Sequence, residues 1–261
     1  MGNNIYRYPK HKRHHRRLLV IPIILMLGIG GIWLSRSHSA PTSSAPTSVE
    51  EPVPAQQPAP PQPVPQAIPE PIPAYPIHNN IVATMFYVGE GSSSENGHIH
   101  NRASVWDEDW QAHYGGVDTP TARNGWLPKG FTPKENPFYI ALPYNDLDDE
   151  GAQKLSARSV YWHAAASGHS LLKNTWVEVC YRGKCAYGQW QDAGPYGEDD
   201  VHYVFGGAPP ANHRDVQAGI DVSPALNDYL GLGGEARVAW RFIQTDHIPA
   251  GPWQQIVTTS R

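Results

Sequence analysis

Cysteine and charge are scarce in this chain, and so are signals for long helices. Only two of the 261 residues are cysteine, and only 17% are Asp, Glu, Lys or Arg. A structural zinc site usually takes four ligands, so two cysteines alone do not indicate one. No G-x-S-x-G motif occurs, so nothing indicates the serine nucleophile that this turn carries in hydrolases. We therefore expect no cofactor, no bound metal and no serine nucleophile.

The two cysteines, Cys180 and Cys185, lie close together in the segment CYRGKC. Gly183 lies between them, and strand-forming residues flank both sides, TWVEV before and AYGQW after. This pattern is typical of the tip of a β-hairpin. An even pair of this kind in an exported domain favours a disulfide.

Basic residues are concentrated at one end of the chain. Residues 1–17 contain six Lys and Arg, and after them only Arg36 is basic before Arg102. Residues 18–34, LLVIPIILMLGIGGIWL, carry no charge. This asymmetry predicts a cytoplasmic tail, contact with the inner membrane through 18–34, and a periplasmic or extracellular remainder. The apolar segment is either an uncleaved single-pass anchor, which its length favours, or a signal peptide cut near 37–39.

Proline is concentrated in the segment that follows. Residues 41–77 contain 13 of the chain's 26 prolines, with Ala, Gln, Ser and Thr between them. This composition cannot bury a core, so we expect a disordered, extended linker over 35–77 that reaches on the order of 100 Å. One folded domain, 78–261, would follow this tether.

The expected domain is acidic and rich in aromatic residues. Residues 78–261 hold 13 Lys and Arg against 21 Asp and Glu, which argues against nucleic acid as a partner. They also hold eight of the nine tryptophans and ten of the 13 tyrosines. Some of these rings build the core, and a surplus of rings on loops would fit stacking on a carbohydrate.

Short strands dominate the pattern of the domain. A clear helical signal covers 223–233, where Ser223 can cap the helix, Pro224 takes its first position and a glycine ends it. Residues 156–166 are a weaker helical candidate. Many short strands with one or two short helices predict a mainly β domain, a small closed barrel. Runs with strand-like alternation cover 81–88, 136–144, 175–181, 185–193, 202–206, 218–222 and 236–244.

Two of these strands lead into recognisable motifs. The first is Asp192-x-Gly194-Pro195-Tyr196, and the second is GIDVS over 219–223, followed by the short helix and the strand ARVAWRF. This order resembles the double-psi β-barrel domains of rare lipoprotein A, the expansins and glycoside hydrolase family 45. The resemblance is good over 175–244 and weak over 81–146, and the segment 89–135 has no counterpart.

The resemblance implies a six-stranded double-psi β-barrel with long loop insertions and a polysaccharide groove on one face. Peptidoglycan and cellulose are the usual ligands of such domains. Asp192 matches the aspartate of the family's D-x-G-P turn. Asp221 matches the position where related lytic transglycosylases and hydrolases keep their proton donor. Two features depart from rare lipoprotein A. Ile140-Ala141 stands where that family has a histidine before Leu-Pro, and the loop between Asp192 and Asp221 is long.

Three carboxylates, Asp192, Asp221 and Asp146, lie at the ends of expected strands and are the candidate catalytic residues. A lytic transglycosylase needs one carboxylic acid, whereas an inverting hydrolase needs two, roughly 6.5–9.5 Å apart. Apolar neighbours of Asp221 would raise its pKa and favour the acid role. Each aspartate also has a structural alternative, as a cap for a helix start or as a turn residue.

Aromatic and amide side chains beside these aspartates are the candidate substrate-binding residues. His98 and His100 form an H-x-H pair, but their loop-like surroundings do not favour a metal site. The expected substrate-binding residues are Tyr87, Tyr144, Asn145, Tyr187, Gln189, Trp190 and Tyr196.

Three functions remain open from the sequence. The first is a membrane-tethered enzyme that cleaves cell-wall glycan by acid/base catalysis at these aspartates. The second is an expansin-like module that binds polysaccharide without breaking bonds. The third is a scaffold whose barrel binds a protein.

Overall fold

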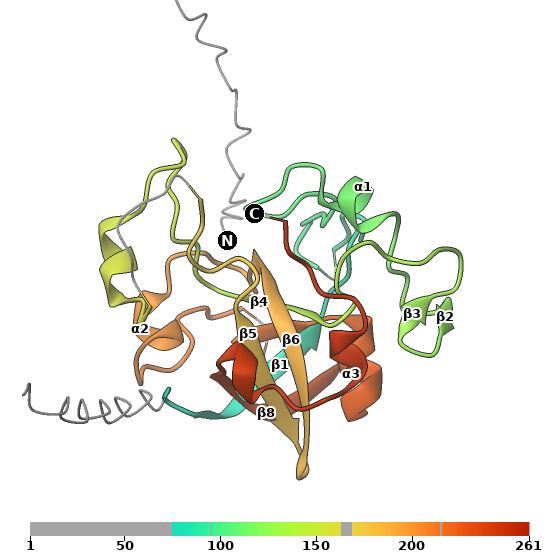
Figure 1. Ribbon diagram of the computed structural model, residues 1–261. Coiled ribbons are helices and arrows are strands. Elements are labelled where there is room, and N and C mark those ends of the chain that lie inside the picture. Colours follow the sequence, from blue (N-terminus) through green and yellow to red (C-terminus); the bar gives the residue numbers. More distant parts are fainter. Residues whose placement is uncertain (1–74, 95, 163–168, 215, 261) are drawn as a thin grey trace, which may run out of the picture. The chain divides into compact units, whose positions relative to one another are not determined.

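The computed structural model describes residues 75–94, 96–162, 169–214 and 216–260 (Figure 1). The tail 1–17, the apolar segment 18–34 and nearly all of the linker lie outside these residues. In the part that is described, no helix has the length and apolarity that crossing a membrane requires.

Six strands form a closed barrel, as the sequence predicts. Their order around the barrel is β1-β7-β4-β6-β5-β8, so strands that are distant in sequence lie side by side. β1 and β7 are parallel, as are β4 and β6, and the other neighbouring pairs are antiparallel. The strands are β1 (His78–Met85), β4 (Tyr139–Leu142), β5 (Trp176–Tyr181), β6 (Lys184–Ala193), β7 (Ile220–Val222) and β8 (Glu235–Phe242).

Apolar side chains at alternate positions of the strands fill the barrel. Ile140 and Leu142 of β4 are fully buried in the main core, together with Trp190 of β6. Ile220 and Val222 of β7 belong to the same core. Side chains two residues apart point to the same face of a strand, so these positions mark the interior. Burial of each such side chain stabilises the fold by about 1.5–3 kcal/mol.

β5 and β6 form the expected hairpin with the expected disulfide. Cys180 lies directly opposite Cys185, and the two sulfurs are bonded. Arg182 and Gly183 form the two-residue turn, and both have positive φ (49° and 80°). This conformation is that of the primed turns, which match the twist of the flanking strands.

The helix expected after β7 is present as α3 (Pro224–Leu230). The hydroxyl of Ser223 accepts a hydrogen bond from the backbone N–H of Leu226 (3.3 Å), and Pro224 occupies the first turn. Gly231 ends the helix with a φ of 73°, which glycine adopts without steric cost. Leu226 is buried against the barrel.

Two other expected elements differ from the structure. The prediction of a strand over 202–206 is wrong, because Val201–Val204 form the short helix α2. The Asp200 side chain accepts a hydrogen bond from the backbone N–H of Tyr203 (3.3 Å), which caps a helical turn. The helix expected over 156–166 is only a 3₁₀-helix, η1 (Leu155–Ser159), and 163–168 lie outside the described residues. Two further 3₁₀-helices are η2 (Thr245–His247) and η3 (Pro252–Gln254).

The segment 89–135 packs on the outside of the barrel (Figure 1, green). It contains α1 (Trp110–Tyr114) and the small sheet of β2 (Arg123–Asn124) and β3 (Leu127–Pro128). A second core, separate from the barrel interior, joins this insert to β4 and to the residues after β1. Its buried members are Phe86, Val88, Trp110, Tyr114, Tyr139 and Ala141.

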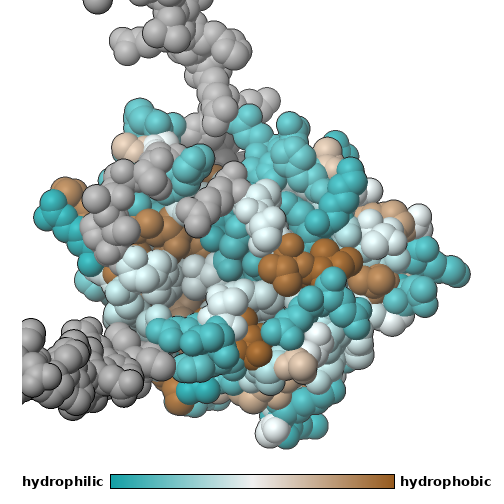
Figure 2. Space-filling model, viewed as in Figure 1, coloured by the Kyte–Doolittle hydropathy of each residue, from teal (hydrophilic) through white to brown (hydrophobic). Residues whose placement is uncertain are grey.

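Few aromatic rings reach the surface. The face in Figure 2 is mostly hydrophilic or neutral, and its hydrophobic patches are separate from one another. Among the described tryptophans and tyrosines, only Tyr161 is exposed (44%). Most of the aromatic residues therefore serve the two cores.

Candidate functional site

Four strands bring one row of residues together across the barrel wall. Thr84 of β1 is paired with Asp221 of β7, and Asp221 is paired with Ala141 of β4. Ala141 is also paired with Asp192 of β6. The two aspartates therefore flank one alanine, with their backbones two strand spacings, roughly 10 Å, apart.

This row faces away from the barrel interior. The residues on either side of Ala141 and Asp221 along their strands point into the main core, as described above. Ala141 itself belongs to the second core, beneath the insert. The row thus lies where the insert meets the barrel wall. We call Thr84, Asp221, Ala141 and Asp192 the carboxylate row.

A β-bulge decides that Asp192 belongs to this row. The register of β4 with β6 shifts after Ile140, which is paired with Trp190, so that Ala141 is paired with Asp192 and Gln191 is the extra residue. In a regular strand Asp192 would share the inward face of Trp190. A bulge re-aims the following side chain, and here it turns Asp192 outward.

Asp221 is half-buried and carries a perturbed carboxyl group. Burial raises its pKa from 3.8 to about 7, while a hydrogen bond from the Thr84 hydroxyl to Oδ1 opposes this rise. Its other oxygen, Oδ2, faces Gly194, where a Cβ atom would lie 3.4 Å away. The absence of a side chain at Gly194 leaves room beside this oxygen.

Asp192 is more enclosed, with 7% of its surface exposed. Its Oδ1 accepts hydrogen bonds from the backbone N–H groups of Val105 (2.9 Å) and Ala193 (2.8 Å). Burial raises its pKa to about 7, against the effect of these two bonds, and the charge of Asp221 raises it further. Val105 lies in the insert, so the insert contributes to the pKa of Asp192 through this hydrogen bond.

Both carboxyl groups have a pKa raised to about 7, and the charge of Asp221 contributes to the rise at Asp192. Near neutral pH such a pair shares protons, and its apparent pKa values belong to the pair. One protonated and one ionised carboxyl beside each other can donate and accept a proton in one reaction. Of the two residues, Asp221 is the more exposed to solvent.

Asp146, the third expected catalytic residue, lies in a different environment. It is fully buried in the loop after β4. Its two oxygens accept hydrogen bonds from the Ser170 hydroxyl (2.6 Å) and from the backbone N–H of Leu171 (2.7 Å). These bonds join two loops, so the structure places Asp146 as a loop brace.

Four of the expected substrate-binding residues are packed in the interior. Trp190 and Tyr144 are fully buried in the main core. Gln189 is 1% exposed and bonds to Asn136 and Thr258. Tyr187 is 7% exposed and donates its hydroxyl hydrogen to Glu178 (2.8 Å). None of these four side chains presents a surface to a polymer.

The other three lie beside the insert or in the loops that follow the strands. Tyr87 and Tyr196 are half-buried. Asn145 is 8% exposed and accepts a hydrogen bond from the indole N–H of Trp106 in the insert (2.9 Å). The amide of Asn145 also donates to Glu198 in the loop after β6 (3.2 Å). This chain of bonds ties the insert to the loops after β4 and β6.

Sequence reasoning missed several members of the site. Thr84 lies within an expected strand, but nothing local indicates that it faces Asp221. Val105 acts through its backbone N–H, which no residue pattern reveals. Glu90 is a further carboxyl in the insert, whose pKa is raised by burial while Asn101 donates a hydrogen bond to it (2.8 Å). Its charge also raises the pKa of Asp221.

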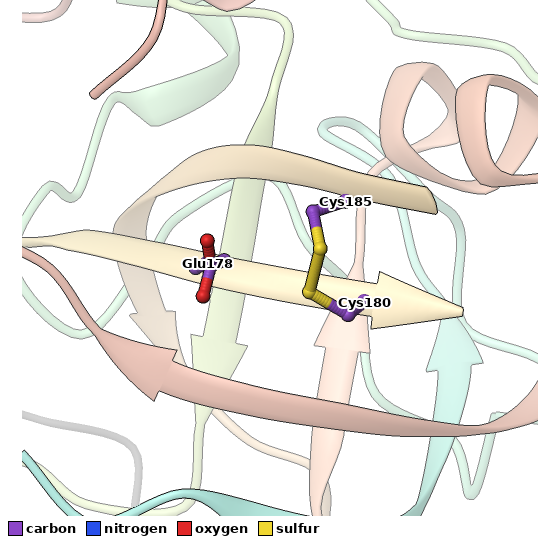
Figure 3. Close-up of side chains that lie close together, drawn as sticks. All are labelled: Glu178, Cys180 and Cys185. Carbon is purple, nitrogen blue, oxygen red and sulfur yellow. A yellow bond between two sulfur atoms is a disulfide. The ribbon is translucent and has the colours of Figure 1, made fainter. Parts of the chain in front are cut away.

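One group of potential metal ligands occurs among the described residues. Figure 3 shows Glu178, Cys180 and Cys185 together on the β5–β6 hairpin. Both sulfurs belong to the disulfide, so neither can act as a thiolate ligand. The carboxylate of Glu178 is bonded to Tyr187 and to Arg241 (2.5 Å). These side chains are therefore engaged in structural contacts.

Comparison with known proteins adds little. No protein-family model matches the chain, and no curated protein matches it. One solved structure, a Streptomyces papain inhibitor, is similar to 67% of this chain over 100% of its own length, with 14% identity and a TM-score of 0.28. A likeness at this TM-score carries no argument about fold or function.

Proposed function

We propose that the domain cleaves the glycan strands of a cell wall, peptidoglycan in particular, with Asp221 as general acid. The observation that carries this proposal is the carboxylate row, in which Asp221 and Asp192 flank Ala141 on one outer face of the barrel. Raised pKa values of both carboxyls, about 7, suit proton transfer near neutral pH. Carboxyls with perturbed pKa values cluster at functional sites, and these two lie on the strands that flank β4.

Asp221 is the proton donor because it is the more accessible of the two. Its protonated carboxyl gives a proton to the glycosidic oxygen as the bond from that oxygen to the anomeric carbon breaks. The carboxylate then accepts a proton from a hydroxyl of the same sugar as this hydroxyl attacks the anomeric carbon. An anhydro end forms, and no second carboxylate is required.

Asp192 supports this reaction as a neighbouring charge. Only 7% of its surface is exposed, which leaves little room for an attacking water beside it. When Asp192 is ionised, its charge favours the protonated form of Asp221. The geometry thus favours the one-acid reaction over an inverting hydrolysis.

The proposal extends to the class of the barrel and its place in the cell. We assign the barrel to the double-psi class, supported by its two parallel pairs, β1 with β7 and β4 with β6, in an otherwise antiparallel order. The basic tail, the apolar segment 18–34 and the proline-rich linker support a domain tethered outside the cytoplasm. A tether of this kind would hold the enzyme near the wall.

A second function, a non-catalytic polysaccharide-binding module, is supported by the enclosure of Asp192. A carboxyl that is 7% exposed and bonded to two amides can serve to hold the insert on the barrel. In this function the face around Asp221 binds the polymer and breaks no bond.

The test is to incubate the full-length protein, in detergent, with purified peptidoglycan and to analyse the products by mass spectrometry. We expect anhydro-muropeptides from the wild type and none from Asp221→Asn. Asp246→Asn is the matched control, because Asp246 is an exposed carboxylate in η2. New reducing ends without anhydro products would show that the protein hydrolyses the bond and would overturn the one-acid reaction. Pelleting with the polymer without any product would support the binding module instead.

A further inference from the structure

An arginine is stacked on a tyrosine beside the carboxylate row. The guanidinium of Arg214 lies 5.2 Å from the centre of the Tyr196 ring. Tyr196 is two residues after Gly194, the residue that faces Oδ2 of Asp221, so its Cα lies within about 7 Å of Gly194. The backbone that carries the stack therefore passes close to the more exposed carboxyl, that of Asp221.

The backbone of Tyr196 is held in an unusual conformation. Its φ is 54°, in the left-handed region that a bulky residue rarely occupies. Residues held in this way cluster at functional sites. Here the conformation places an aromatic ring under the guanidinium.

The insert packs directly against the same stack. A Cβ atom at Gly97 would lie 2.8 Å from Nη1 of Arg214 and 3.1 Å from Cε1 of Tyr196. Gly97 has a φ of 66°, so both its conformation and its lack of a side chain suit this close approach. Three segments, the insert and the loops before and after α2, thus position one cation.

The surroundings of this cation are acidic. The charges of Asp221 and Glu198 raise the pKa of Asp192, and the charge of Glu90 raises the pKa of Asp221, so these carboxylates lie near one another. Such a site would repel an anionic polymer unless a cation lies beside it. Arg214 is exposed and planar, and a guanidinium fork matches a carboxylate in two parallel hydrogen bonds.

We propose that Arg214, held on Tyr196, binds a carboxylate of the substrate, so that the site selects an acidic glycan over a neutral one of the same linkage. This inference rests on the proposed function and names the substrate class of that site. Peptidoglycan strands freed of their peptides are such a polymer, because alternate sugars carry a lactyl carboxylate. Chitin has the same β-1,4 linkage and N-acetyl groups without any carboxylate.

The test measures binding of the full-length protein, in detergent, to peptide-free peptidoglycan strands and to chitin by co-sedimentation. We expect Arg214→Gln to weaken binding to the acidic strands about ten-fold and to leave binding to chitin unchanged, since one charge-assisted contact is lost. Arg214→Lys should weaken this binding less, because lysine keeps the positive charge and loses only the two parallel hydrogen bonds of the guanidinium. Added salt should weaken wild-type binding to the acidic strands and narrow the gap to the variant.

Arg182→Gln is the matched control. Arg182 is also exposed and also stacked on a tyrosine, 4.9 Å from the Tyr181 ring, but it lies at the tip of the β5–β6 hairpin. Unchanged binding of Arg182→Gln to both polymers is expected. Equal binding of Arg214→Gln and wild type to the acidic strands, or an equal loss on both polymers, would overturn the subsite while the proposed function stands. A wild type that binds and cleaves neither polymer would overturn the proposed function itself.

Discussion

Replacing Asp192 by Asn tests the perturbed carboxyl pair through stability. Asn has the same shape, and its amide oxygen can accept the same two bonds from the N–H groups of Val105 and Ala193. The substitution therefore removes a buried titrating group without removing a hydrogen-bond acceptor. Any change in the pH dependence of unfolding then reports the charge of Asp192.

The magnitude follows from the pKa of Asp192, which burial raises from 3.8 to about 7. Because the folded pKa lies above the unfolded one, the stabilising contribution is complete below pH 4 and is lost as the pH rises through 7. One pKa unit corresponds to about 1.4 kcal/mol, so the wild type should lose about 3 kcal/mol from this group between pH 5 and pH 8.5. Asp221 titrates in the same range, so this figure is an upper bound for Asp192 alone.

The assay is urea unfolding of the full-length protein in detergent at pH 5 and pH 8.5, followed by tryptophan fluorescence. The free energy of unfolding of Asp192→Asn minus that of wild type should be about 2–3 kcal/mol larger at pH 8.5 than at pH 5, because only the wild type is destabilised at high pH. The exposed Asp246→Asn should show no such difference. If Asp192→Asn shifts stability equally at both pH values, the carboxyl is not perturbed and the reasoning about the pair fails.

Three further predictions concern the barrel and the proposed reaction. Thr84→Val removes the bond that lowers the pKa of Asp221, so the alkaline limb of the cleavage rate should move up by about one pH unit; a limb that stays in place would refute the role of Thr84. Gly188→Ala would place a Cβ atom 2.8 Å from Cδ1 of Leu226, so urea unfolding should show a loss of about 1–3 kcal/mol, and wild-type stability would contradict this packing. Replacing both Cys180 and Cys185 by Ser should lower stability by about 2 kcal/mol with an unchanged circular dichroism spectrum, since the bond closes only a short loop; loss of the spectrum would mean that folding depends on it.

Local patterns predicted much of the fold. Alternation of apolar residues located the six barrel strands, because the period of two follows from the pleat itself. The cap at Ser223, the proline at Pro224 and the glycine at Gly231 bound α3 as expected, since these signals act within one turn. The strand expected over 202–206 failed because its apolar residues also suit a short helical turn, and the Asp200 cap decided between the two.

Prediction of the site was less complete. Asp192 and Asp221 are brought together, but Asp146 is not, because its bonds to Ser170 and Leu171 hold it in another loop. Strand-end aspartates look alike in sequence, and their partners come from segments far away along the chain. The sequence also does not show which aromatic residues are buried. Trp190, for example, was expected to bind substrate but fills the barrel interior.

The amino-acid sequence by itself determined the strands, the capped helix, the disulfide hairpin and the acidic character of the domain, because each depends on neighbouring residues or on composition. Only the tertiary structure decided the site. Barrel closure placed β4 between β6 and β7, and a bulge of one residue turned Asp192 from the face of Trp190 to the face of Asp221. A backbone N–H of the insert then completed its environment. A register shift and a backbone donor carry no side-chain signature, so strand pairing had to be known before Asp192 and Asp221 could be separated from Asp146.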